Sequence, residues 1–172
     1  MLDFQEKAMI LDLESVFNTE GLSKEFEYEL DLSEEEISAS KPFTSPVRVS
    51  GCVSNSTGIV ELKAKADFVL ELDCDRCAKP IKPELSTEIN HTLVTSLNDD
   101  TNDELVLVNE LRFDLDELVI EDIFLSLPVK FLCKEDCKGI CPNCGGDLNQ
   151  GECGCEKEVD PRLAVLKQLL DK

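Results

Sequence analysis

The chain has 172 residues, a formal net charge of −20 and a hydrophobic content of 42%, which fit one globular domain with a small addition. Its first residues, MLDFQEKAMILDLE, lack the basic stretch and apolar run of a secretory signal peptide. No apolar segment approaches the ~20 residues that cross a bilayer. We therefore expect a cytoplasmic protein with no membrane partner, in a reducing compartment where cysteines bind metal more often than they form disulfides.

Charge is distributed unevenly along the chain. Residues 1–132 contain 11 Lys and Arg against 29 Asp and Glu, a balance of −18, whereas residues 133–172 contain 6 against 8, a balance of −2. The acidic N-terminal part repels phosphate backbones, which disfavours broad nonspecific binding to nucleic acid. It attracts basic proteins, ribosomal proteins among them, although the same charge also serves solubility alone.

Alternating apolar and polar residues predict β-strands over the first two thirds of the chain. KEFEYELDL places Phe26, Tyr28 and two leucines on one face and four acidic residues on the other. PVRVSGCVS and GIVELKAKADFVLELD flank the turn residues NSTG, which predicts a long hairpin. Further strands are expected around Ile89 and at LVLVNEL, separated by the acidic loop NDDTNDE.

Two helices are expected after these strands. DLDELVIEDIFLSLP begins with Asp114 as a helix cap and ends at Pro128. DPRLAVLKQLL has Asp160 as a cap and Pro161 at the first helical position, and we expect it to dock on the rest of the chain.

The pattern predicts an α+β fold, with an antiparallel β-sheet or partly closed barrel, one or two packing helices and a small zinc-bound tail. The predicted divisions are an acidic body at 1–132, a cysteine-rich segment at 133–159 and a C-terminal helix at 160–172.

The nine cysteines carry the clearest chemical signal. At LDCDRCAKP, Pro80 and the nearby Pro83 disfavour the helix that a thioredoxin-type C-x-x-C requires at its first cysteine. A tight turn that presents Cys74 and Cys77 to a metal fits this stretch better. Downstream, CPNCG has the form of a zinc knuckle, and Cys153 and Cys155 of CGC can complete a tetrahedral set with Cys141 and Cys144.

Cys133 and Cys137 then remain, so eight cysteines in four close pairs make two four-sulfur zinc sites. The alternative is a cluster confined to the tail, with the upstream pair free. The candidate ligands are Cys74, Cys77, Cys133, Cys137, Cys141, Cys144, Cys153 and Cys155.

Packing capacity also favours bound zinc. Between residues 133 and 159 the large apolar side chains are Ile140, Leu148 and Val159. These three cannot offset an ordering cost of ~1–2 kcal/mol per residue. A structural zinc ion contributes about 10–16 kcal/mol in apparent terms, so we expect the tail to be disordered without metal.

Catalysis is not expected. Four thiolates close a zinc site and leave no position for water. The single histidine, His91, is interpreted as a structural residue on the buried face of a strand, and Cys52 as a small packing residue. No glycine-rich phosphate loop is present, so neither a catalytic residue nor a small-molecule substrate is assigned.

The order of these motifs resembles the YceD family, the large ribosomal RNA subunit accumulation proteins. The resemblance covers roughly residues 58–172 and rests on CDRC, DLDELVIEDIFLSLP, CKEDCKGICPNCGGDLN, CGC and DPRLAVLKQLL. The resemblance implies a bacterial protein, with plastid relatives, that is linked to the accumulation of large-subunit (23S) ribosomal RNA. The gene of a small zinc-ribbon ribosomal protein commonly neighbours that of family members.

The resemblance also implies how the thiols group. Some members lack CPNCG…CGC but keep the strand-end pair and a Cys or His pair after the helix. This implies one site made by Cys74, Cys77, Cys133 and Cys137, with the last four cysteines as an added second site. It further implies a factor in ribosome biogenesis, which we expect to be non-enzymatic. The placement of charge makes a basic ribosomal protein or assembly factor the expected partner, with ribosomal RNA as a second contact of the nearly neutral tail. A zinc-knuckle regulator that binds nucleic acid and a thiol-based redox switch are the alternatives.

Overall fold

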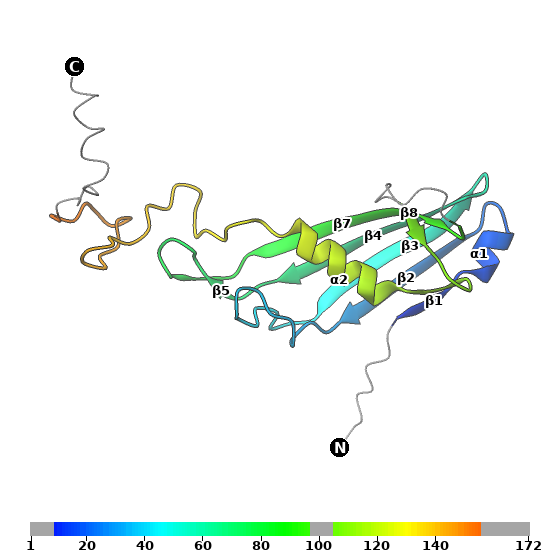
Figure 1. Ribbon diagram of the computed structural model, residues 1–172, viewed down its shortest axis with the longest axis horizontal. Helices are drawn as coiled ribbons and strands as arrows, with labels where there is room; N and C mark the ends of the chain where they lie inside the picture. Colours follow the sequence, from blue (N-terminus) through cyan, green and yellow to red (C-terminus); the bar gives the residue numbers. More distant parts are fainter. Residues whose placement is uncertain (1–8, 97–104, 156–172) are drawn as a thin grey trace, which may run out of the picture. The chain divides into compact units, whose positions relative to one another are not determined.

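The computed structural model describes residues 9–96 and 105–155, and Figure 1 shows the course of the chain. Of the described residues, 9–72 with 80–96 and 105–130 form one compact unit, here the sheet unit, and 73–79 with 131–155 form another, here the cysteine unit. The elements in chain order are β1 Ile10–Asp12, α1 Glu14–Asn18, β2 Ser23–Leu30, β3 Val47–Ser56, β4 Ile59–Val69, β5 Leu72–Asp73, β6 Pro80–Ile81, β7 Glu84–Val94, β8 Leu105–Leu107, β9 Arg112–Asp114 and α2 Leu115–Ser126.

The sheet unit is built on a five-stranded sheet with the order β2-β3-β4-β7-β8. The predicted hairpin is present, because β3 and β4 pair antiparallel with Ser56 opposite Ile59. Thr57 and Gly58 between them have φ angles of 54° and 84°. Two successive left-handed residues match the twist of the flanking strands in a two-residue hairpin turn. The strand that was expected around Ile89 is β7, which pairs antiparallel with β4.

Successive side chains along these strands point to opposite faces of the sheet, so that one face is buried and the other is polar. Exposed charged residues alternate with the buried ones, as Glu25 and Glu27 do on either side of Phe26. Complete burial of a large aliphatic side chain stabilises the fold by roughly 1.5–3 kcal/mol, so this row supplies much of the sheet unit's stability. Its members are Phe26, Val49, Val53, Val60, Leu62, Ala66, Phe68, Ile89 and Leu93.

Helix α2 lies across the sheet (Figure 1) and begins where the sequence predicted. The Asp114 carboxylate accepts a hydrogen bond of 3.1 Å from the backbone N–H of Asp116, which satisfies one of the free donors of the first turn. Leu115, Leu118, Val119 and Ile123 are buried. At the other end the hydroxyls of Ser126 and Thr87 are 2.6 Å apart, which ties the last turn of the helix to β7.

The α+β class is confirmed, and the sheet is mostly antiparallel and open, with no closed barrel. Strand β8 differs from the rest because it pairs parallel to β7, with Leu93 opposite Val106. The short strand β1 pairs with β9, about a hundred residues later. Neither pairing has a local sequence signal, because each joins segments through a long connection.

Some predictions fall outside the described residues. These are the acidic loop at 98–104 and the C-terminal helix at 160–172. The boundaries at residues 132 and 159 between the three predicted divisions of the chain also stay predictions. Within the described ranges, the helices are too short or too polar to cross a membrane.

Candidate metal centres

The upstream cysteine pair lies in a tight turn between β5 and β6. The backbone N–H of Cys74 donates to the carbonyl of Lys79 at 2.8 Å, and the N–H of Ala78 donates to the carbonyl of Cys74 at 2.8 Å. Ala78 has a left-handed φ of 51°. Residues 75–77 therefore form a turn and do not begin a helix, so the arrangement differs from that of a thioredoxin-type active site.

Three hydrogen bonds hold the segment after α2 against this turn. The N–H of Asp75 donates to the carbonyl of Phe131 at 2.9 Å, and the N–H of Phe131 donates to the Asp75 carboxylate at 2.6 Å. Arg76 Nη1 donates to the carbonyl of Cys137 at 2.6 Å. The contacts bring residues about sixty positions apart within reach of one another.

The result is the first tetrad, formed by Cys74, Cys77, Cys133 and Cys137. All four Sγ atoms lie within 4.8 Å of one another. The Sγ atoms of Cys74 and Cys137 are 3.8 Å apart, and those of Cys77 and Cys133 are 3.6 Å apart.

The second tetrad comes entirely from the tail and consists of Cys141, Cys144, Cys153 and Cys155, whose Sγ atoms also lie within 4.8 Å. Two backbone hydrogen bonds close the CPNCG knuckle. The N–H of Cys141 donates to the carbonyl of Gly146, and the N–H of Gly145 donates to the carbonyl of Cys141, both at 2.8 Å. Gly145 has a φ of 71°, a conformation that favours glycine.

Both donor sets fit zinc. Tetrahedral zinc with Zn–S bonds of about 2.3 Å separates its sulfur ligands by about 3.8 Å, close to the spacings of the first tetrad. Four soft thiolates select zinc over calcium or magnesium, which prefer oxygen. The geometry is thus compatible with two metal ions, without identifying the metal.

In each tetrad, hydrogen bonds from backbone N–H groups lower the pKa of one thiol, Cys74 in the first and Cys141 in the second. Burial has the largest effect on Cys74 and raises its pKa, but backbone N–H groups, that of Arg76 first, outweigh it and lower the pKa to about 6. At Cys141 the backbone N–H of Cys144 is the main cause, and it lowers the pKa to about 6. A thiolate that accepts such hydrogen bonds is a ready metal ligand.

A second thiol in each tetrad has the opposite tendency. Burial and then the neighbouring thiols raise the pKa of Cys133 to about 12. The contact with Cys144, followed by burial, raises the pKa of Cys155 to about 12. Four thiolates so close together repel one another, and a divalent cation at the centre removes this repulsion as it displaces the remaining protons.

The cysteine unit has little apolar packing of its own. Its buried side chains among the described residues are four ligand cysteines, Cys74, Cys77, Cys137 and Cys141. Ile140 is 46% exposed. Metal–sulfur bonds would therefore supply the stability that a hydrophobic core supplies elsewhere.

Residues outside the ligand set were missed by the sequence reasoning. Asn149 Nδ2 lies 3.5 Å from Cys137 Sγ, and the Asp147 carboxylate is 2.7 Å from Lys79 Nζ. Asparagine, aspartate and lysine are common in loops, and nothing in GGDLNQG distinguishes these side chains from solvated ones. Only their positions reveal them.

Cys52 and His91 belong to the sheet unit, and neither is in a tetrad. Cys52 is partly exposed on β3, with Lys63 and Glu25 as its neighbours across the strands. His91 Nε2 is 2.7 Å from the Asp122 carboxylate on α2, and the His91 side chain is 14% exposed. His91 thus links β7 to α2, as a structural histidine would.

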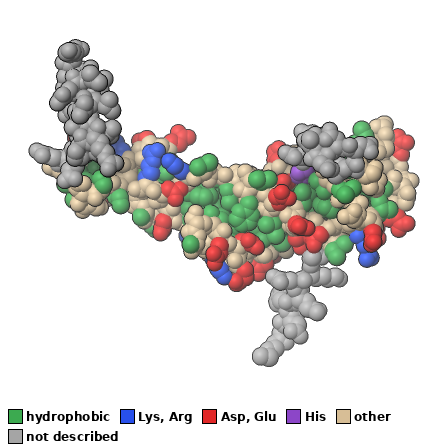
Figure 2. All heavy atoms as spheres, viewed as in Figure 1, with side chains coloured by type: hydrophobic (Ala, Val, Ile, Leu, Met, Phe, Trp, Pro, Cys, Tyr) green, Lys and Arg blue, Asp and Glu red, His purple; other side chains and the backbone are tan. Residues whose placement is uncertain are grey.

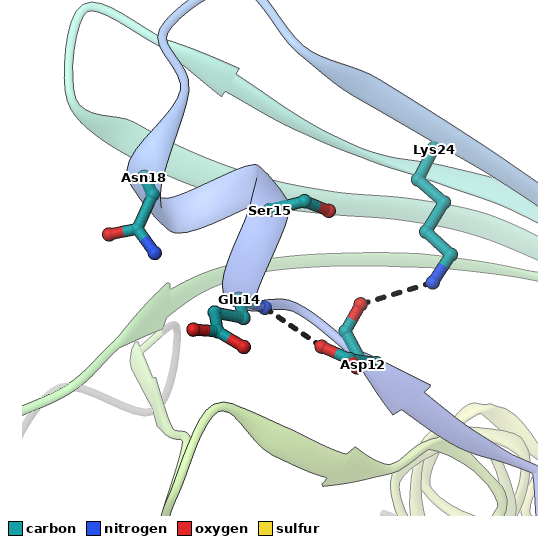
Figure 3. Close-up of a pocket in the computed structure, with 5 residues that line it drawn as sticks. All are labelled: Asp12, Glu14, Ser15, Asn18 and Lys24. Atoms are coloured by element: carbon teal, nitrogen blue, oxygen red, sulfur yellow. Dashed lines mark hydrogen bonds between the residues drawn. The ribbon is translucent and has the colours of Figure 1, made fainter.

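The sheet unit also has a hollow of about 410 Å³ beside α1 (Figure 3). It is lined by Asp12, Glu14, Ser15, Asn18 and Lys24. Lys24 Nζ donates to the carbonyl of Asp12 at 3.1 Å, and the Asp12 carboxylate accepts from the N–H of Glu14 at 3.1 Å.

The order of strands, capped helix and cysteine pairs matches a known family. The family model described as "Large ribosomal RNA subunit accumulation protein YceD" matches residues 62–170. The chain belongs to the YceD family. The matched residues include β7, α2 and all eight cysteines of the two tetrads.

Curated proteins of similar sequence carry the description "Uncharacterized protein". YlbN of Bacillus subtilis (strain 168) is 30% identical over 129 residues, which are 73% of this chain and 75% of YlbN. Proteins of Mycobacterium tuberculosis and Mycobacterium bovis are each 30% identical over 102 residues, 57% of this chain. The match spans 49% of the length of these mycobacterial relatives. No solved structure matches the chain.

Proposed function

We propose that this chain is a non-enzymatic factor in ribosome biogenesis that promotes the accumulation of large-subunit ribosomal RNA in the cytoplasm. The observation that carries the proposal is the YceD match over residues 62–170, because the family is described by that role. The two cysteine tetrads support a second part, that the chain holds two structural zinc ions.

Zinc would be held by Cys74, Cys77, Cys133 and Cys137 in one site and by the four tail cysteines in the other. Bound there, it would supply a closed four-sulfur centre with no position for water. Such a centre cross-links chain segments and performs no hydrolysis, in keeping with a non-enzymatic role.

The acidic surface supports a basic protein partner. On edge strand β2, Glu25, Glu27 and Glu29 are exposed in one row, and Figure 2 shows further Asp and Glu side chains on the face that carries α2. A second copy of the chain is a poor partner for this edge, since antiparallel pairing of two β2 strands would oppose glutamates. A basic ribosomal protein or assembly factor has complementary charge.

The ratio of large- to small-subunit ribosomal RNA in cells depleted of the chain tests the main proposal. We expect a selective fall in large-subunit RNA before growth slows, restored by the wild-type chain. An unchanged ratio would contradict the role in ribosome biogenesis. Complementation with a Cys74→Ser/Cys141→Ser variant then asks whether that role requires the metal sites.

Salt dependence tests the proposed partner contact. Affinity for a basic ribosomal protein should fall as salt rises, since salt screens exposed charges. The triple variant Glu25→Gln/Glu27→Gln/Glu29→Gln should bind more weakly than Glu34→Gln/Glu35→Gln/Glu36→Gln, which removes the same charge elsewhere. Equal affinity at low and high salt would contradict an electrostatic contact.

A thiol-based redox switch is the second candidate, and the distance of 3.6 Å between Sγ of Cys77 and Sγ of Cys133 favours it. Thiol titration and metal content discriminate between the two. Two zinc ions per chain with no fast-reacting thiols support structural sites, whereas metal-free protein with two reactive thiols supports the switch.

A further inference from the structure

The loop between the two ligand pairs of the tail site reaches the other tetrad. Asn149 lies between Cys144 and Cys153 in the sequence, yet its Nδ2 lies 3.5 Å from Sγ of Cys137 in the first tetrad. Asn149 Oδ1 accepts a hydrogen bond of 2.9 Å from the backbone N–H of Lys138, beside the same cysteine. Both ends of the Asn149 amide thus engage the first site.

The Asp147 carboxylate holds the Asn149 side chain in place. Its Oδ1 accepts from the backbone N–H of Asn149 at 2.9 Å and from Asn149 Nδ2 at 2.8 Å. Its Oδ2 is 2.7 Å from Nζ of Lys79, which follows Cys77 in the upstream turn. The Asp147 side chain is 16% exposed, so this carboxylate is shielded more than a surface ion pair.

The backbone adds a further contact between the loop and the first site. The N–H of Leu148 donates to the carbonyl of Gly139 at 3.0 Å, and the N–H of Ile140 donates to the carbonyl of Arg76 at 3.2 Å. Backbone hydrogen bonds therefore join Arg76 and Leu148 to the adjacent residues Ile140 and Gly139. Each of these bonds lies within the cysteine unit.

The loop itself has little to hold it in this shape. Between Cys144 and Cys153 the one large apolar residue is Leu148, and the stretch contains Gly145, Gly146 and Gly151. Glycine-rich chain loses much conformational entropy when it is ordered. A metal that joins Cys141 and Cys144 to Cys153 and Cys155 closes the loop at both ends and offsets part of that cost.

We propose that the two metal sites are coupled, so that metal at the tail tetrad strengthens metal binding at the first tetrad through Asn149 and Asp147. The coupling rests on the proposed zinc binding. A donor held against a ligand sulfur stabilises the metal-bound thiolate, and loss of such an outer contact typically weakens metal affinity about 10–100-fold. Linkage makes the effect reciprocal, so the first site strengthens the tail site by the same factor.

The test measures zinc affinity of the first tetrad in the full-length chain by competition with a chelator of known affinity. The variant Cys141→Ser/Cys153→Ser removes the tail site. Spectra of the cadmium-loaded protein, in which each four-sulfur site gives its own cadmium signal, assign the metal to a site. We expect first-tetrad affinity to fall at least tenfold in this variant.

Asn149→Asp tests the route of the coupling, since it keeps the size of the side chain, removes the donor to Cys137 and places a negative charge beside that sulfur and the Asp147 carboxylate. It should weaken the first tetrad about tenfold when the tail site is intact and have little effect when the tail site is absent. Asn90→Asp makes the same change at an exposed position on β7 and should leave both affinities unchanged. The comparison forms a double-mutant cycle.

The outcomes separate the coupling from the proposal beneath it. If wild-type protein binds no zinc or cadmium, both the zinc proposal and the coupling are wrong. If two ions bind and first-tetrad affinity is the same with and without the tail site, the zinc proposal stands and the coupling is wrong. If affinity falls without the tail site but Asn149→Asp has no effect, the assignment to Asn149 is wrong.

Discussion

Gly139 lies directly against the backbone of Arg76: a Cβ on Gly139 would be 2.8 Å from the Arg76 carbonyl oxygen. Gly139 also has a φ of 76°, in the left-handed region. The residue thus meets two constraints at once, the conformation and the close approach, and both arise where the upstream turn meets the tail. Only glycine satisfies both without a shift of the backbone.

We therefore expect Gly139→Ala to destabilise the metal-bound cysteine unit by about 1–3 kcal/mol, the usual cost of a strained backbone residue. Chelator competition should show weaker zinc binding at the first tetrad. Gly154→Ala is the matched control, since a Cβ there meets nothing within 4 Å. Equal zinc affinity in the two variants would show that the contact with Arg76 does not matter.

Zinc content should follow the grouping of the thiols. Wild-type protein purified under reducing conditions should contain two zinc ions per chain, because each tetrad has four sulfurs at tetrahedral spacing. Cys74→Ser/Cys133→Ser and Cys141→Ser/Cys153→Ser should each contain one. Cys52→Ser should keep two, since Cys52 lies on β3 outside both sets. Metal analysis beside protein concentration measures this, and loss of zinc from Cys52→Ser would refute the grouping.

Metal removal should loosen the cysteine unit and spare the sheet unit. Lys134 and Lys138 are exposed in a segment whose buried residues are mainly cysteines. After chelation we expect trypsin to cleave rapidly at these lysines. Fragments from β3, β4 and β7 should persist, because those strands carry the apolar core.

Mass spectrometry of the time course identifies the cleavage sites. Addition of zinc after chelation should restore protection, which controls for an effect of the chelator itself. A tail that resists trypsin equally with and without metal would show that its stability has another source.

Tyr28 should stay neutral until the sheet unit unfolds in alkali. Burial is the main cause that raises the pKa of Tyr28 far above its usual value of about 10, and the Asp116 carboxylate adds to the rise. Because the folded-state pKa is the higher one, the stabilising effect is fully present below about pH 10 and is lost as pH rises beyond it.

Tyr28 is the single tyrosine, and the chain has no tryptophan, so tyrosinate absorbance reports this residue alone. Absorbance should rise together with the loss of β-sheet circular dichroism. Asp116→Asn removes the nearby negative charge and should lower the pKa of Tyr28 in the folded protein, so that the absorbance begins to rise before the circular dichroism changes. Ionisation at ordinary tyrosine pH in the folded protein would contradict the burial of this side chain.

How far the fold could be predicted depended on how local each signal was. The alternation around Phe26 and Ile89, the turn at Thr57–Gly58 and the cap at Asp114 are properties of a few adjacent residues, and each is present in the structure. β1 and α1 were missed: they have three and five residues, and Leu13 before α1 makes no side-chain cap. Elements so short lack a period long enough to detect.

The sequence by itself determined the ligand chemistry, because C-x-x-C and CGC spacing already places thiols within reach of a shared metal. It left the grouping of the eight cysteines open between two sites and a tail-only cluster. The tertiary structure decided that Cys74 and Cys77 join Cys133 and Cys137, since the contacts of Asp75 with Phe131 close a loop of more than fifty residues.

The placement of Asn149 on Cys137 was likewise decided in three dimensions. An asparagine in a glycine-rich loop has the same local signature whether it faces solvent or a thiol. Side-chain contacts across the tetrads depend on how the chain closes on itself, and that closure is the sum of many distant backbone contacts which no short window of residues encodes.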